Sequence, residues 1–175
     1  MWIPVPEAVR RLDERGLVKH RRRDQSELII DYVETKLGRR LPEDLADFYR
    51  ANVDRLGDFD SRMPTWNAWT GWREDVFGVT SLLMHQVVPI MNDGCGNVYA
   101  VDISSDDDQP AVYFIDEGTY PERLGFAVGS SIGAFLLLQA DHDRAHLEGW
   151  PPRWELQIDP DLERCPRAPA IWNAG

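Results

Sequence analysis

The chain has 175 residues, of which 43% are hydrophobic and 28% are charged, a composition typical of a single globular domain and not of a disordered chain. Its 30 acidic residues outnumber its 19 Lys and Arg residues, and the net charge of −11 argues against nonspecific nucleic-acid binding, which depends on neutralising phosphates. Two cysteines, Cys95 and Cys165, are too few for a disulfide scaffold.

The first forty residues are predicted to be mainly helical. We expect one helix over Pro6–Leu17 that ends at Gly16, so that residues 1–22 form an N-terminal helical extension. Asp24 and Glu27 have the spacing of a capping box, which predicts that a second helix begins at Asp24. Gly38 follows the last apolar position of that helix and is expected to end it.

The middle of the chain changes from helical to strand-like patterns. Pro42 suits the first turn of a third helix, which is expected to end near Asn52. Four later runs are predicted as strands, namely residues 85–91, 97–103, 111–115 and 124–128. Pro89 indicates an edge or a bulge in the first of them, and the alternation of Tyr99 and Val101 indicates that one face of the second is buried.

The end of the chain completes the predicted architecture. A last long helix is expected from Ser131 to about His146, followed by a tail over residues 148–175 with five prolines, extended and packed on the body. Helices that flank a run of strands joined by short connections indicate a single α+β domain over residues 1–175, with a central, mostly antiparallel sheet.

One serine lies in a motif with catalytic potential. Residues 129–133 match G-x-S-x-G, the nucleophile elbow of α/β-hydrolases. A catalytic triad needs a base placed apart from the nucleophile, yet the histidines that follow Ser131 are His142 and His146, in or beside the same helix. We therefore expect Ser130 or Ser131 to cap that helix and predict a protein that is not an enzyme, with a small serine hydrolase that uses Ser131 as the alternative.

Two patterns suggest a metal site, and neither is complete. His142 and His146 have the i, i+4 spacing of a chelating pair but lack a further ligand in sequence. The acidic segment from Asp102 resembles a calcium loop, but Asp107 stands where the EF-hand has Gly and Tyr113 where it has Glu. The sequence therefore predicts neither a metal nor a cofactor.

Two groups of residues are candidates for binding a partner. Tryptophan is costly to expose but common at interface hot spots, so packing on the domain and a binding surface both remain open for Trp66, Trp69 and Trp72. An acidic loop is either a solvated hairpin tip or a docking patch for basic side chains. The acidic candidates are Asp106, Asp107, Asp108, Asp116 and Glu117.

Several stretches together resemble the SUKH superfamily. The matching stretches are Leu37–Leu45, Val88–Ile90, Gly94–Asp102, Ala111–Tyr113 and Ala127–Leu136, in an arrangement that spans about residues 24–140. The resemblance implies a helix-flanked antiparallel sheet without catalytic residues. Many bacterial members look like immunity proteins that block toxins, often nucleases, so the resemblance implies such a role. Others are regulatory adaptors, as in the yeast cell-wall assembly regulator group.

The charge distribution agrees with the first of these roles. Residues 1–40 carry ten basic and seven acidic residues, whereas residues 41–175 carry nine basic and 23 acidic residues. Such an acidic body would attract a basic toxin domain by electrostatic steering, although the charge also serves solubility alone. We expect a cytoplasmic protein that does not bind membranes, because no leader or membrane-spanning segment is evident. We also expect the protein to bind no nucleic acid and to be a monomer or a weak dimer.

Overall fold

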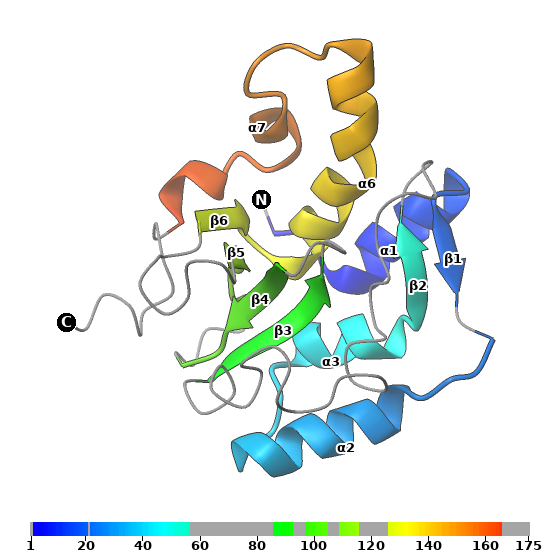
Figure 1. The fold of residues 1–175 in the computed structure, drawn as a ribbon, viewed down its shortest axis with the longest axis vertical. Coiled ribbons are helices and arrows are strands. Elements are labelled where there is room, and N and C mark those ends of the chain that lie inside the picture. Colours follow the sequence, from blue (N-terminus) through cyan, green and yellow to red (C-terminus); the bar gives the residue numbers. More distant parts are fainter. Residues whose placement is uncertain are drawn as a thin grey trace.

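A computed structural model describes residues 2–20, 22–56, 86–92, 97–104, 109–115 and 126–165, which form helices and antiparallel strands (Figure 1). The helices are α1 (Val5–Glu14), α2 (Ser26–Leu37), α3 (Glu43–Arg50), α6 (Ile132–Glu148), α7 (Glu155–Ile158) and the 3-10 helix η2 (Leu162–Arg164). The strands are β1 (Val18–His20), β2 (Val53–Leu56), β3 (Val87–Asn92), β4 (Val98–Asp102), β5 (Val112–Ile115) and β6 (Phe126–Gly129).

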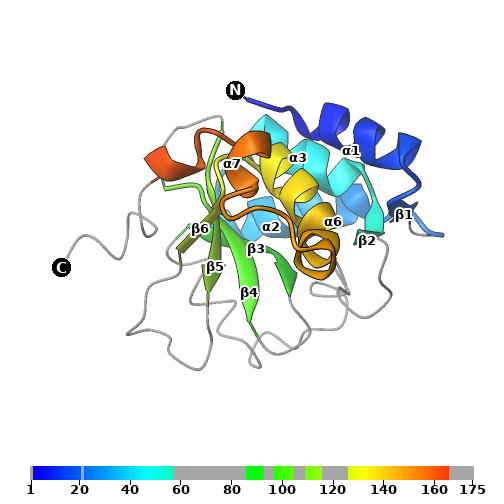
Figure 2. The same cartoon turned by 90° about the horizontal axis from the view of Figure 1, so that it is seen from above.

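The central sheet has the order β3-β4-β5-β6, and every neighbouring pair is antiparallel. The register between β3 and β4 shifts between Pro89 and Met91, which confirms the irregularity predicted at the proline. Helices α1, α3 and α6 pack together on one side of this sheet (Figure 2). The predicted α+β class, with an antiparallel sheet flanked by helices, is therefore confirmed.

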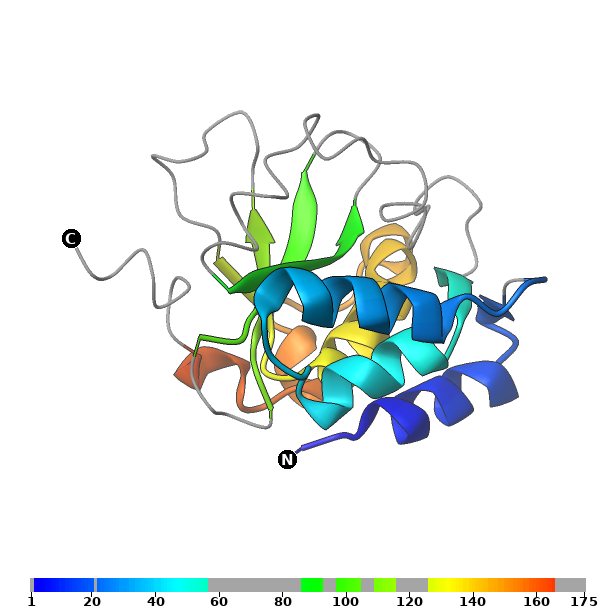
Figure 3. The ribbon, with the colours of Figure 1, turned by 90° about the horizontal axis from the view of Figure 1, so that it is seen from below.

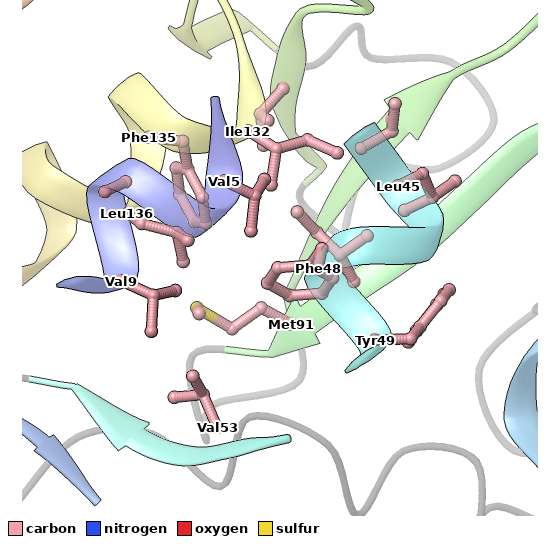
Figure 4. Close-up of a cluster of buried hydrophobic side chains, with 14 of the residues drawn as sticks. Val5, Val9, Leu45, Phe48, Tyr49, Val53, Met91, Ile132, Phe135 and Leu136 are labelled. Carbon is pink, nitrogen blue, oxygen red and sulfur yellow. The ribbon is translucent and has the colours of Figure 1, made fainter. Parts of the chain in front are cut away.

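The core lies between this sheet and the helices, where apolar side chains from both interdigitate (Figure 4). Tyr99 and Val101 of β4 face this core, and the Tyr99 ring lies 5.0 Å from that of Phe135 in α6. The other face of β4 is buried as well, because Val98 and Ala100 are 1% and 0% exposed, so the alternation does not separate a buried face from an exposed one. Phe48 and Tyr49 of α3, each 1% exposed, fill the space between α3 and the sheet. Helix α3 itself lies between α1 and α2 (Figure 3).

Helix α1 belongs to the same core. Its apolar residues Val5, Ala8, Val9 and Leu12 recur at helical spacing and are at most 8% exposed. This face packs against α6 and α3. Gly16 adopts a left-handed φ of 70° just after the helix, close to the predicted end.

The predicted capping box at the start of α2 is wrong. The helix begins at Ser26, and the backbone N–H and hydroxyl of Ser26 donate to Asp24 Oδ1 at 3.0 and 2.6 Å. Glu27 does not reach back to the chain, because its carboxylate accepts a hydrogen bond from Arg50 Nε at 3.0 Å. The end of the helix agrees with the prediction, since Gly38 is left-handed with φ of 68°.

Two further features differ from the sequence expectation. Strands β1 and β2 form a separate two-stranded sheet that no periodicity indicated, because they have only three and four residues. Residues 148–165 are not extended throughout but contain α7 and η2. Asp159, which is 1% exposed, holds this segment on the β6–α6 turn by accepting bonds from the Ser130 N–H and hydroxyl at 2.7 and 2.6 Å.

A buried carboxylate connects α1 with α3. Asp44, in the first turn of α3, is 6% exposed, and its Oδ1 accepts a hydrogen bond from the Val5 N–H at 3.1 Å. Its Oδ2 is buried without a hydrogen-bond partner in the described part of the chain. Burial raises the pKa of Asp44 to about 6, the charge of Asp47 acts in the same direction, and the Val5 hydrogen bond opposes both.

We expect Asp44→Asn to change how stability depends on pH. Because the folded-state pKa of about 6 lies above the ordinary value of 3.8, protonation of Asp44 favours the folded state. This contribution is fully present below about pH 4 and is lost as the pH rises through 6. The free energy of unfolding of the wild type, relative to Asp44→Asn, should therefore fall by about 2 kcal/mol between pH 4 and pH 7.

Urea denaturation of both proteins at the two pH values measures this difference. Asp31→Asn, at an exposed carboxylate on α2, is the control and should show a much smaller change. A difference between wild type and Asp44→Asn that stays constant with pH would contradict the assignment.

Candidate functional site

The predicted partner-binding residues lie outside the described part of the chain, so their roles stay predictions. These residues are Trp66, Trp69, Trp72, Asp106, Asp107, Asp108, Asp116 and Glu117. The described strands nevertheless fix where the segments that carry them join the fold.

The strand register shows at which end of the central sheet each of these segments is attached. Val87 pairs with Asp102, and Val101 pairs with Val112, so the segment 57–86 enters the sheet at the end where the acidic loop leaves and returns. Ile115, which precedes Asp116 and Glu117, pairs with Val98 at the other end of the strands. The attachment points of the tryptophan segment and of the Asp106–Asp108 loop are therefore neighbours, whereas that of Asp116 and Glu117 is not.

One arginine joins the two neighbouring attachment points. Arg39 Nη1 donates to Gln86 Oε1 at 3.2 Å and to the Ile103 carbonyl at 3.1 Å, while the Ile103 N–H donates to the Gln86 carbonyl at 2.9 Å. Arg39 follows Gly38 at the end of α2, so the glycine turn places its side chain at this junction. The sequence placed Arg39 in a family-like stretch but did not indicate this contact, because the partners are 47 and 64 residues away.

The G-x-S-x-G segment has a structural role in this fold. Ser131 is the N-cap of α6, is 2% exposed, and its hydroxyl oxygen accepts a hydrogen bond from the Ala134 N–H at 3.2 Å. Helix geometry places His142 about 15 Å further along α6, too far to activate Ser131. The expected cap is confirmed, and the buried, hydrogen-bonded hydroxyl gives the hydrolase hypothesis no support.

We expect Ser131→Ala to lower the free energy of unfolding by about 0.5–2 kcal/mol, the usual cost of removing an N-cap acceptor. Partner binding should not change, because the hydroxyl is buried. Urea denaturation measures the loss, with Ser104→Ala as a control at an exposed serine. Covalent labelling of the wild type by a fluorophosphonate, absent in Ser131→Ala, would contradict the structural role.

The other candidate chemical groups are not brought together. His142 and His146 are exposed, and His142 Nδ1 lies 3.3 Å from Asp143 Oδ1. Within the described residues, no three His, Cys, Asp or Glu side chains are grouped so that they could hold a metal ion. Burial raises the pKa of the Cys165 thiol to about 11, and the charges of Asp159 and Asp161 add to this, so the unreactive thiol form dominates near neutral pH.

Comparison with known proteins agrees with this arrangement. The model of the SMI1/KNR4 family (SUKH-1) matches residues 26–137, well over half of the chain. The chain belongs to the SMI1/KNR4 family. The match confirms the resemblance found in the sequence, whereas no curated protein and no solved structure matches the chain.

The family match divides the described elements of this SUKH-1 protein into two sets. The matched region runs from α2 to the first third of α6 and includes the whole central sheet. Helix α1, the end of α6, and α7 lie outside it, although α1 and α6 are in close contact. None of the described helices combines the length and the apolar character that crossing a membrane would need.

Proposed function

We propose that this SUKH-1 protein is an immunity protein that neutralises a basic toxin domain by direct binding. The observation that carries the proposal is the combination of family membership with the acidic charge of residues 41–175, which have 23 acidic and nine basic residues. Toxin domains that act on nucleic acids are typically basic, because they must bind phosphates. An acidic binding protein is therefore complementary to such a toxin.

Charge and apolar contacts would have separate effects in this complex. Exposed acidic side chains at the rim of an interface mainly raise the association rate, whereas buried apolar anchors mainly slow dissociation. We assign the first role to Asp106, Asp107 and Asp108 and the second to Trp66, Trp69 and Trp72. The segment that carries the tryptophans and the loop that carries the aspartates join the sheet at neighbouring points.

A regulatory adaptor is the alternative, because the chain matches the SMI1/KNR4 family and other members of the SUKH superfamily are regulatory adaptors. The two roles differ in the partner. An immunity protein binds the toxin domain encoded beside it and protects cells that make that toxin, whereas an adaptor binds a protein of its own cell. The genes that neighbour this one therefore supply the first candidate for the partner.

The experiment measures binding to the C-terminal domain of a large secreted protein encoded by a neighbouring gene. Replacing the three loop aspartates by asparagine should slow association and reduce its dependence on salt. Trp→Ala at an exposed position should speed dissociation, at a cost of about 2 kcal/mol or more. The charge-matched control is Asp13→Asn, Glu14→Gln and Asp31→Asn, at exposed positions on α1 and α2.

Wild-type protein that neither binds this domain nor protects cells would disprove the immunity role. Equal effects of the loop variant and its control would show that only net charge matters and that the loop is a solvated tip. Unfolding of all three Trp→Ala variants would place these tryptophans in the core and the interface elsewhere.

A further inference from the structure

One residue at the start of the central sheet has an unusual backbone conformation. Gln86, which directly precedes β3, has a φ of 59°, in the left-handed region that residues other than glycine seldom adopt. Such a conformation is strained, and it persists only where the surrounding structure holds it in place. The contacts of Gln86 therefore have to offset this strain.

Hydrogen bonds to two distant residues hold Gln86 in this conformation. Its side-chain Oε1 accepts a hydrogen bond from Arg39 Nη1 at 3.2 Å, and its backbone carbonyl accepts one from the Ile103 N–H at 2.9 Å. The same nitrogen of Arg39 donates to the Ile103 carbonyl at 3.1 Å, so each of the three residues contacts the other two. Arg39, Gln86 and Ile103 are here called the Arg39 clamp.

The clamp is attached to well-packed parts of the fold. Ile103 is buried, and Val87, the residue after Gln86, is buried and pairs with Asp102 in the sheet. Arg39 lies just after the end of α2, which is beside the start of β3 (Figure 3). Loss of the clamp would therefore leave α2, β3 and β4 in place and would release mainly the backbone of Gln86.

The side chain of Gln86 contributes something that a turn alone does not need. Glycine adopts a positive φ without steric cost, so it is the residue best suited to a turn of this kind. Glycine has no side chain that could accept the hydrogen bond from Arg39. What Gln86 adds to the turn is therefore its contact with Arg39.

The clamp lies where two segments of the chain join the sheet. Gln86 is the first described residue after the segment 57–85, and Ile103 is close to the start of the loop at residues 105–108. A change of φ at Gln86 would rotate the chain before it relative to β3, because each residue has only two freely rotating backbone bonds. Arg39 thus fixes the points at which both segments join the sheet.

We propose that Arg39 is a positioning residue for partner binding, which acts by holding Gln86 in its left-handed conformation. This inference rests on the proposed function, which assigns the apolar anchors to the segment before Gln86 and the acidic rim to the loop after Ile103. A partner that contacts both segments requires one relative position of the two. Without the clamp, binding would first have to order them, which weakens affinity.

The first test compares Arg39→Met with Arg40→Met, at the neighbouring exposed arginine. Both substitutions remove one positive charge, so electrostatic attraction alone would make both variants bind a basic partner more tightly. We expect Arg39→Met instead to raise the dissociation constant about tenfold, the order of magnitude of one lost hydrogen bond to a charged group. Arg40→Met should not weaken binding. The partner is an inactivated form of the toxin domain encoded by the neighbouring gene.

The second test uses Gln86→Gly, which removes the contact with Arg39 and relieves the backbone strain. The variant should melt close to the wild type, because the relief of strain offsets the lost hydrogen bond, and yet bind about tenfold more weakly. If Gln86 only formed a turn, the variant would bind like the wild type. Asn52→Gly is the control, because Asn52 has a similar φ of 50° in the turn before β2 and its replacement should not change binding.

The variant that combines Arg39→Met with Gln86→Gly should bind no more weakly than either single variant, because both remove the same contact. Additive losses would show that the two residues act independently and would overturn the inference. Wild-type affinity in either single variant, or equal weakening by Arg40→Met, would overturn it as well. Wild type that does not bind this domain would instead contradict the proposed function.

Amide exchange in the unbound protein tests the clamp without any partner. The Ile103 N–H reports on it directly, because this group donates to the Gln86 carbonyl. We expect hydrogen–deuterium exchange at Ile103, followed by NMR, to be faster in Arg39→Met than in the wild type, with unchanged exchange in β5. Equal exchange at Ile103 in the two proteins would show that Arg39 does not hold Gln86 and would overturn the inference while the proposed function stands.

Discussion

Gly133→Ala should destabilise the protein by about 3 kcal/mol or more, the upper end of the usual cost of overpacking. A Cβ on Gly133 would lie 2.0 Å from the Ile3 carbonyl oxygen and 3.0 Å from the Ile3 carbonyl carbon. Both are backbone atoms, so no change of side-chain rotamer relieves the contact. The segment before α1 would have to move away from the start of α6, which would expose Ile3 and Val5, now 7% and 0% exposed.

Gly149→Ala is the matched control for this prediction. Gly149 has a left-handed φ of 64°, and its Cβ would have no atom within 4 Å, so the substitution adds backbone strain without a collision. Its cost should be about 1 kcal/mol. Urea denaturation measures both variants. A loss of less than 0.5 kcal/mol in Gly133→Ala, on the order of a neutral surface change, would show that the two backbones do not touch.

Removing residues 1–21 should prevent folding, although this segment lies outside the region that the family model matches. The deletion takes away α1 and exposes the side of α6 that it covers. Each buried aliphatic side chain contributes about 1.5–3 kcal/mol, and the segment contains Ile3, Val5, Val9, Leu12 and Leu17 at 0–8% exposure. Their sum is comparable with the whole stability of a domain, about 5–15 kcal/mol.

Circular dichroism and thermal melting of the truncated chain test this prediction. Leu12→Ala in the full chain is the graded comparison, and it should cost about 2–5 kcal/mol while the fold is retained. Cooperative melting of the truncated chain within a few degrees of the full chain would show that α1 is an independent appendage.

The hydrophobic periodicity of the sequence, together with the residues that start and end helices, determined most helices and the strands of the central sheet. Gly38 ended α2 and Ser131 capped α6 as expected, because each acts on the backbone within a few residues of its own position. Pro42, which was expected in the first turn of α3, lies one position earlier, at the N-cap. The α+β class followed from the order of these elements. Local signals of this kind need no knowledge of distant residues.

Contacts between distant residues decided the remainder. Glu27 does not cap α2 but binds Arg50, which is 23 residues away. Asp159, in a segment predicted to be extended, binds Ser130, which is 29 residues away. Strands β1 and β2 are too short to show a period, and they exist because each pairs with the other. Such pairings gain their energy from long-range contacts that no local window contains.

The candidate binding surfaces show the same division. The acidic charge, which favours a basic partner over a nucleic acid, could be derived from the sequence alone, because net charge is a sum over residues and does not depend on the fold. Only the tertiary structure decided that Arg39 joins the attachment points of the tryptophan segment and the acidic loop, and that the rings of Trp150 and Trp154 meet. Exposure and proximity depend on how the helices and strands pack, so they cannot be derived from residue types alone.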